Sequence, residues 1–80
     1  MKLLAKEWAS YRERVVPVNA HAIQVQESRR AFYAGAASLW GLLMTVLDPG
    51  EEPTDLDMAK MGAFQAELDD FQRDVEAGRA

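Results

Sequence analysis

The chain of 80 residues contains no cysteine. This absence excludes disulfide bonds, zinc sites built from thiolates and cysteine nucleophiles. Small chains bury only about 60% of their unfolded surface, and they are commonly stabilised by disulfides, a structural metal or oligomerisation. Disulfides are rare in cytosolic proteins, so the composition also fits a cytoplasmic protein. We therefore expect a cytoplasmic chain that gains stability by self-association.

Histidine is almost as scarce, because His21 is the only one. A zinc site needs several histidine or cysteine ligands, and nucleophilic catalysis needs a serine or cysteine beside a base. The three serines lie in predicted helices with no motif around them: Ser10, Ser28 and Ser38. We predict no enzymatic activity, no catalytic residue, no metal and no cofactor. His21 is expected to act as a polar helix cap or a surface residue.

Basic residues are in the minority, with nine lysines and arginines against thirteen acids and a net charge of −4. The two halves differ: residues 1–40 carry six basic and three acidic residues, net +3, whereas residues 41–80 carry three and ten, net −7. A negative chain without a basic stripe is not expected to bind extended duplex nucleic acid. The asymmetry indicates either an anion-binding part beside an acidic part, or two parts that attract one another or are simply solvated.

A long apolar run that would cross a membrane is also missing. The longest uncharged segment covers residues 31–47, which is 17 residues, and a transmembrane helix needs about 20. Glycine, serine and threonine dilute this segment, and Trp40 sits inside it rather than at a membrane interface. We therefore predict no membrane partner, and we assign the segment to a core and to contacts with other copies of the chain.

Helical periodicity is what the sequence does contain. Leu4, Trp8, Tyr11 and Val15 follow one another at steps of four, three and four, which predicts one face of a first helix that ends near residues 14–16. Val16 precedes proline and is pushed toward an extended conformation. Asn19 is a candidate N-cap for the next helix.

A long second helix is predicted over about residues 20–47, with two apolar faces. The first face contains Val25, Phe32, Ala36, Leu39, Leu43 and Val46, and the second contains Tyr33, Ala37, Trp40, Met44 and Leu47. A helix that is apolar nearly all round is buried nearly all round, and two short helices do not cover it completely. We predict a symmetric homo-oligomer, most simply a two-fold dimer, through Tyr33, Ala37, Trp40, Gly41, Met44 and Leu47.

A third helix is predicted over about residues 55–77, after a turn at Asp48-Pro49-Gly50. Thr54 and Asp57 have the spacing of a capping box, and Gly78 is a natural stop. An apolar stripe runs along this helix: Met61, Phe64, Leu68, Phe71 and Val75. The predicted fold is all-α, an antiparallel three-helix bundle with a long central helix over about 20–47, forming a single domain over residues 1–80.

One cluster has the chemistry of a binding site. Gln26, Arg30 and Tyr33 share a helical face with Arg29 beside them, and a first helix that folds back would add Trp8, Tyr11 and Arg12. Arginine offers a planar fork for phosphate, and aromatic rings stack on bases. The alternative is structural: Trp8 and Tyr11 belong to the core, and the two arginines pair with Glu27 or with the acidic third helix.

The pattern Trp8-x-x-Tyr11-Arg12, followed by Val16-Pro17 and by the sequence Arg-Arg-Ala-Phe-Tyr-Ala-Gly-Ala at residues 29–36, resembles a group of small uncharacterised proteins encoded by bacteriophages and prophages. The turn at residues 47–50 and the Thr54 cap are similar too. The resemblance covers most of the chain but carries no functional signature. It implies a phage-encoded protein that acts in the cytoplasm of the host cell.

A phage origin implies roles in countering host immunity. The leading hypothesis is a molecular sponge, an oligomer that sequesters a cyclic nucleotide-like signal in pockets between its subunits. The alternative is a protein-binding inhibitor of a host defence protein, similar to an anti-CRISPR protein or a nucleic-acid mimic, that acts through the acidic C-terminal helix. A phage adaptor or assembly protein is the third possibility. The expected partners are therefore other copies of the chain, together with a small anionic ligand or a host protein.

Overall fold

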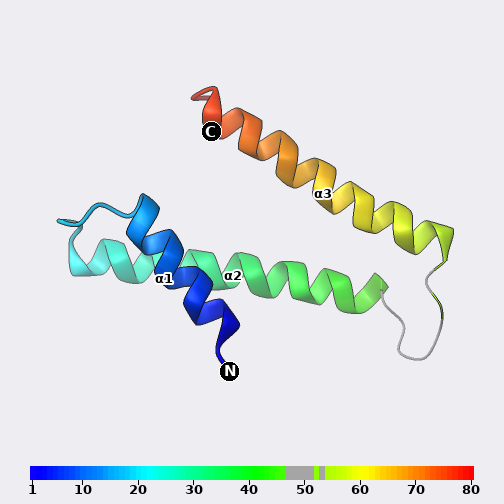
Figure 1. Cartoon of the computed structure of the whole chain (residues 1–80), viewed down its shortest axis with the longest axis horizontal. Helices are drawn as coiled ribbons and strands as arrows, with labels where there is room; N and C mark the ends of the chain where they lie inside the picture. The colour runs from blue at the N-terminus through cyan, green and yellow to red at the C-terminus, as the bar shows by residue number, and fades with distance from the viewer. Residues whose placement is uncertain (47–51, 53) are drawn as a thin grey trace. The chain divides into compact units, whose positions relative to one another are not determined.

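The computed structural model describes residues 1–46, 52 and 54–80, and every element in that part of the chain is a helix (Figure 1). The helices are α1 (Leu3–Val15), α2 (Ala22–Val46) and α3 (Asp55–Glu76). The all-α class and the three helices are as predicted. The proposed turn at Asp48-Pro49-Gly50 lies outside the described residues, as does Leu47.

The chain divides into two compact units, Met1–Trp40 and Gly41–Ala80. The first, unit 1, contains α1 and most of α2, and the second, unit 2, contains the last turn and a half of α2 together with α3. The boundary coincides with the change in charge, so unit 1 carries +3 and unit 2 carries −7. The single domain over residues 1–80 stays a prediction.

The connection between α1 and α2 is tight. Val16 has extended backbone angles, φ −79° and ψ 126°, because the following proline disfavours a helical conformation there. The amide of Ala20 donates to the carbonyl of Pro17 at 3.0 Å and closes a turn. This turn includes Asn19, so the predicted N-cap was wrong and α2 begins two residues later. His21 caps the helix instead, as its Nδ1 accepts from the amide of Ile23 at 3.1 Å.

The core of unit 1 is aromatic. Figure 1 shows α1 crossing the first half of α2, and Trp8 at this crossing is only 7% exposed. The Phe32 ring lies 5.6 Å from Trp8 and 5.7 Å from Tyr11, and Tyr33 packs edge-on against Phe32 at 5.8 Å. Such offset and tilted ring pairs are favourable beyond the area that they bury. This cluster holds α1 against α2.

The helix ends of α3 agree with the prediction. The amide of Asp57 donates to Oγ1 of Thr54 and the amide of Thr54 donates to Oδ2 of Asp57, both at 3.1 Å, which completes the capping box. At the other end Gly78 has φ +73°, a conformation that glycine adopts without a steric penalty. The amides of Gly78 and Arg79 donate to the carbonyls of Val75 and Asp74, the pattern that closes a helix in a Schellman motif.

The apolar stripe of α3 is uncovered along much of its length. No α3 residue is fully buried, and Phe71 is 61% exposed. Met61, Leu68 and Val75 are exposed with it, whereas Phe64 is half-buried. Within the described part of unit 2, Val46 is the one buried apolar residue. Among the described helices, none is both long enough and apolar enough for a membrane crossing.

Candidate functional site: a basic cleft between α1 and α2

A cleft of about 750 Å³ opens on unit 1 between α1 and the first half of α2. Its lining consists of Trp8, Arg12, Ala22, Val25, Gln26, Arg29, Arg30 and Tyr33. Six of the seven residues predicted to bind a ligand therefore meet here, contributed by both helices. The exception is Tyr11, which packs on Trp8 and Phe32 and does not line the cleft.

The local helical geometry explains this convergence. Ala22, Gln26, Arg29 and Tyr33 recur at steps of four, three and four along α2, so their side chains stand above one another on one face. The aromatic cluster then fixes α1 beside that face and brings Arg12 to it, one turn after Trp8. Ala22 belongs to this repeat and Val25 lies beside it, and neither was predicted as part of the site.

The lining of the cleft carries three positive charges and no carboxylate. Arg30 pairs with Glu27 at 3.5 Å, but both side chains are well exposed, and such a pair contributes little because solvent screens it. The Arg29 guanidinium lies over the ring of Tyr33, 5.4 Å from its centroid. This cation–π contact orients the guanidinium beside the cleft without neutralising its charge.

The two predicted stacking residues from α1 are occupied within the protein. Trp8 is buried and forms part of the cleft floor, and Tyr11 contacts two other rings. Trp8 therefore belongs to the core, as the structural alternative has it, whereas Tyr11 is 36% exposed and is not a core residue. Tyr33 is half-buried and lines the cleft, and it remains the aromatic side chain best placed to contact a ligand.

The residues predicted to form an oligomer interface lie mainly on an open surface. Trp40 is 63% exposed, and Ala37, Gly41 and Met44 are exposed with it, whereas Tyr33 is half-buried beside the cleft and Leu47 lies outside the described residues. The neighbouring apolar face of α2 is better covered, since Phe32, Ala36 and Leu43 are half-buried and Val46 is buried, although Leu39 is 37% exposed. A β-carbon built on Gly41 would contact no other atom within 4 Å.

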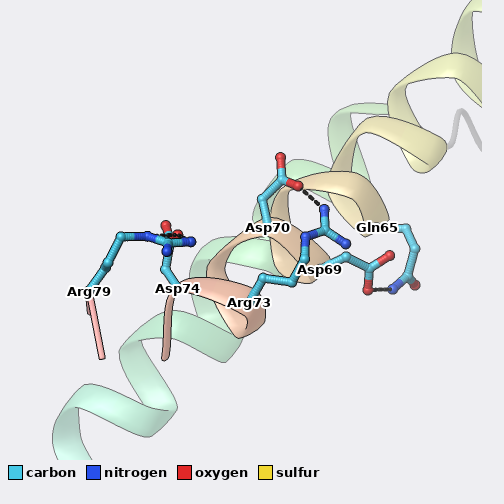
Figure 2. A network of polar contacts seen from close by, with 6 residues as sticks. All are labelled: Gln65, Asp69, Asp70, Arg73, Asp74 and Arg79. Carbon is cyan, nitrogen blue, oxygen red and sulfur yellow. Dashed lines mark hydrogen bonds and ion pairs between the residues drawn. The ribbon is translucent and has the colours of Figure 1, made fainter. Parts of the chain in front are cut away.

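Three acidic side chains of α3 form polar contacts with neighbours on the same unit (Figure 2). Asp70 pairs with Arg73, Oδ1 of Asp74 accepts from Arg79 at 2.8 Å, and Oδ1 of Asp69 accepts from the amide of Gln65 at 2.9 Å. These contacts lie on the surface and are individually weak. Among the described residues, α3 included, no three histidine, aspartate or glutamate side chains are grouped so that they could hold a metal ion.

Comparison of the chain with models of known families, with curated proteins and with solved structures finds no match. The resemblance to small phage proteins therefore stays a prediction. A function for this chain has to come from the chemistry of its own residues, and the basic cleft is where that chemistry is concentrated.

Proposed function

We propose that this chain is a non-enzymatic binding protein that sequesters a small anionic, nucleotide-like ligand in the basic cleft of unit 1. The observation that carries the proposal is the meeting of Arg12, Arg29 and Arg30 around one cleft that no carboxylate lines. Guanidinium groups donate paired hydrogen bonds to phosphate, so this set favours a ligand with more than one phosphate.

The remaining lining residues suit the other parts of a nucleotide. The ring of Tyr33 offers an aromatic surface for a base or a sugar, and the side-chain amide of Gln26 can both donate and accept hydrogen bonds at a base edge. Ala22 and Val25 supply apolar contact area. A cleft of about 750 Å³ lies within the usual range of small-ligand sites.

Sequestration requires affinity and no turnover, which suits a cleft that contains no pair of nucleophile and base. Together with the resemblance to phage proteins, it supports a role in countering host immunity by removal of a cyclic nucleotide-like signal. The proposal includes a symmetric homo-oligomer in the cytoplasm, in which the three helices form an antiparallel bundle. The open face of α2 around Trp40 supports the oligomer, because monomers rarely expose large apolar surfaces.

Arginine substitutions test the site directly. Arg29→Ala is expected to weaken binding of cyclic di-AMP or ADP-ribose by about 10- to 100-fold, because a hydrogen bond to a charged group contributes roughly 1.5–3 kcal/mol. The measurement is isothermal titration calorimetry at fixed ionic strength. Arg14→Ala is the matched control, since Arg14 lies on α1 outside the cleft, where its Nε donates to Ser10 Oγ at 3.3 Å.

An equal loss of affinity in Arg29→Ala and Arg14→Ala would mean that binding depends on the net charge of the chain and not on the cleft. Neither variant should change the melting temperature by more than a few degrees, because both side chains are exposed. If the wild-type chain binds neither probe, the proposed nucleotide-binding function fails.

A second candidate function is inhibition of a basic host protein through α3, and the uncovered stripe around Phe71 favours it. An amphipathic helix flanked by Asp69, Asp70 and Asp74 fits a hydrophobic groove with a basic rim. A complex of this kind should weaken steeply as salt is raised, and Phe71→Asp should abolish it. A role as an adaptor or assembly protein would use the same surface.

A further inference from the structure

The basic cleft and the open apolar surface of α2 lie on one face of the same helix. Gln26, Arg30, Tyr33, Ala37, Trp40 and Met44 follow one another at alternating steps of four and three. Residues with this spacing form a single stripe along a helix. The first half of the stripe lines the cleft and the second half is exposed. Whatever covers the second half therefore lies next to the cleft.

A second copy of α2 fits this stripe when it runs antiparallel with the two-fold axis at Ala37. In that register Tyr33 lies opposite Gly41 of the second copy, and Trp40 lies opposite its Ala34. The two large aromatic side chains then each meet a small residue, as interlocking helix surfaces require, and Arg30 lies opposite Met44 of the second copy. The absence of any atom near a β-carbon on Gly41 leaves the room that an incoming Tyr33 needs.

Charge selects the same orientation. In a parallel pair, Arg29 and Arg30 of the two copies would lie side by side and repel. In the antiparallel pair, Arg30 of one copy is 14 helical positions from Arg30 of the other, which is about 21 Å at 1.5 Å per residue. That distance exceeds the screening length of about 8 Å at physiological salt. Residues 31–46 of α2 carry no charge, so the arginines of one copy meet no like charge on this part of the second copy.

We propose that the second copy completes the binding site, with its Trp40 lying beside Tyr33 at the open side of the cleft. A ligand base would then be held between Tyr33 of one copy and Trp40 of the other, while Arg12, Arg29 and Arg30 hold its phosphates. Two equal sites form in each dimer. This arrangement supplies the stacking tryptophan that Trp8, buried in the core, does not. The role of Trp40 toward a ligand depends on the proposed function, whereas the dimer geometry does not.

Cysteine cross-linking tests the dimer geometry without any ligand. The chain has no cysteine, so each single-cysteine variant reports on one position. A disulfide requires α-carbons about 4.4–6.8 Å apart. Ala37→Cys should therefore cross-link to itself rapidly, whereas Met44→Cys, about 21 Å from its equivalent in the antiparallel pair, should not. Cross-linking of both variants would establish a parallel dimer, and cross-linking of neither would remove this face as the interface. Either result overturns the proposal.

The role of Trp40 is then measured in the dimer locked by Ala37→Cys, so that loss of the interface does not mimic loss of the site. Trp40→Ala should weaken cyclic di-AMP or ADP-ribose binding by about 5- to 100-fold, the range for stacking one base on an aromatic ring. Leu42→Ala is the control, because Leu42 is also exposed but lies outside the stripe.

Unchanged affinity in the locked Trp40→Ala dimer would overturn the shared site. If Ala37→Cys cross-links but the locked dimer binds neither probe, the nucleotide-binding function fails while the dimer geometry stands. If both probes bind and Ala37→Cys does not cross-link, the cleft functions without a second copy and this inference fails by itself.

Discussion

Units 1 and 2 each contain a helix with an apolar stripe, α1 and α3, but only the stripe of α1 includes a buried residue. In unit 1, α1 places Trp8 against Phe32 of α2, and the tryptophan is almost fully buried. In unit 2, the stripe of α3 repeats with the same spacing, yet none of its residues is buried. The difference shows that helical periodicity identifies a face that needs a partner. It does not show whether the partner lies in the same chain.

The charges of the two units differ in arrangement as well as in sign. Three of the four arginines of unit 1 converge from two helices on one cleft that has no acidic lining residue. Seven of the ten acids of unit 2 lie along α3, and Asp69, Asp70 and Asp74 each have a partner on the same unit (Figure 2). Converging charges of one sign favour the binding of an oppositely charged ligand, whereas locally paired charges on a surface are mainly solvated. The arrangement of charge in unit 1 therefore says more about a binding function than the larger net charge of unit 2.

The largest effect expected from this comparison is on stability. Trp8→Ala should lower the free energy of unfolding by about 3–5 kcal/mol, because it removes the buried centre of the aromatic cluster. Phe71→Ala should cost less than about 1 kcal/mol in the dilute chain, since the Phe71 ring is already largely in water. Urea denaturation followed by circular dichroism measures both. An equal loss in the two variants would show that α3 has a partner in solution as important as that of α1.

An intermediate effect is expected at the start of α3. Thr54→Ala removes the side-chain acceptor of the capping box and should cost about 1 kcal/mol. Ser38→Ala is the control, because Ser38 Oγ bonds to the carbonyl of Ala34 inside a helix, where the hydroxyl gives no net stabilisation. Amide hydrogen exchange should become faster in α3 and stay unchanged in α1. Faster exchange throughout the chain would mean that the two units unfold together and that the comparison between them does not extend to local stability.

The smallest effect is expected from the surface ion pairs. Asp70→Asn breaks the contact with Arg73 and should change the free energy of unfolding by no more than about 0.5 kcal/mol, because both groups are exposed. The same substitution tests the second candidate function, since it lowers the negative charge of α3 without unfolding it. A thermal denaturation scan gives the result. A change of several degrees in melting temperature would mean that the polar contacts in Figure 2 stabilise α3 substantially.

Much of the fold was predictable because it depends on local chemistry. The helix periods, the Val16-Pro17 break, the reciprocal cap at Thr54 and the glycine stop at Gly78 each act within a few residues. The error at Asn19 has a local cause as well, because the turn closed by Ala20 and Pro17 was not recognised. The residues of the cleft followed from the same helical spacing, with α1 folding back as expected.

The environment of each aromatic residue was harder to predict, because it depends on contacts between elements. Trp8 and Trp40 both lie on apolar faces, yet one is 7% and the other 63% exposed. Sequence spacing places each on a face but does not say which neighbour covers that face. Tyr11 illustrates the same limit: it shares a face with Trp8, but it packs on Phe32, stays 36% exposed and does not line the cleft.

Native mass spectrometry of the full chain, alone and with cyclic di- and trinucleotides and ADP-ribose, tests the central claim most directly. The account predicts a dimer, or a symmetric assembly of dimers, that gains one ligand mass per chain and loses that gain with Arg29→Ala but not with Arg14→Ala. An assembly that stays free of every nucleotide at concentrations well above those in a cell would contradict the basic cleft as a nucleotide site.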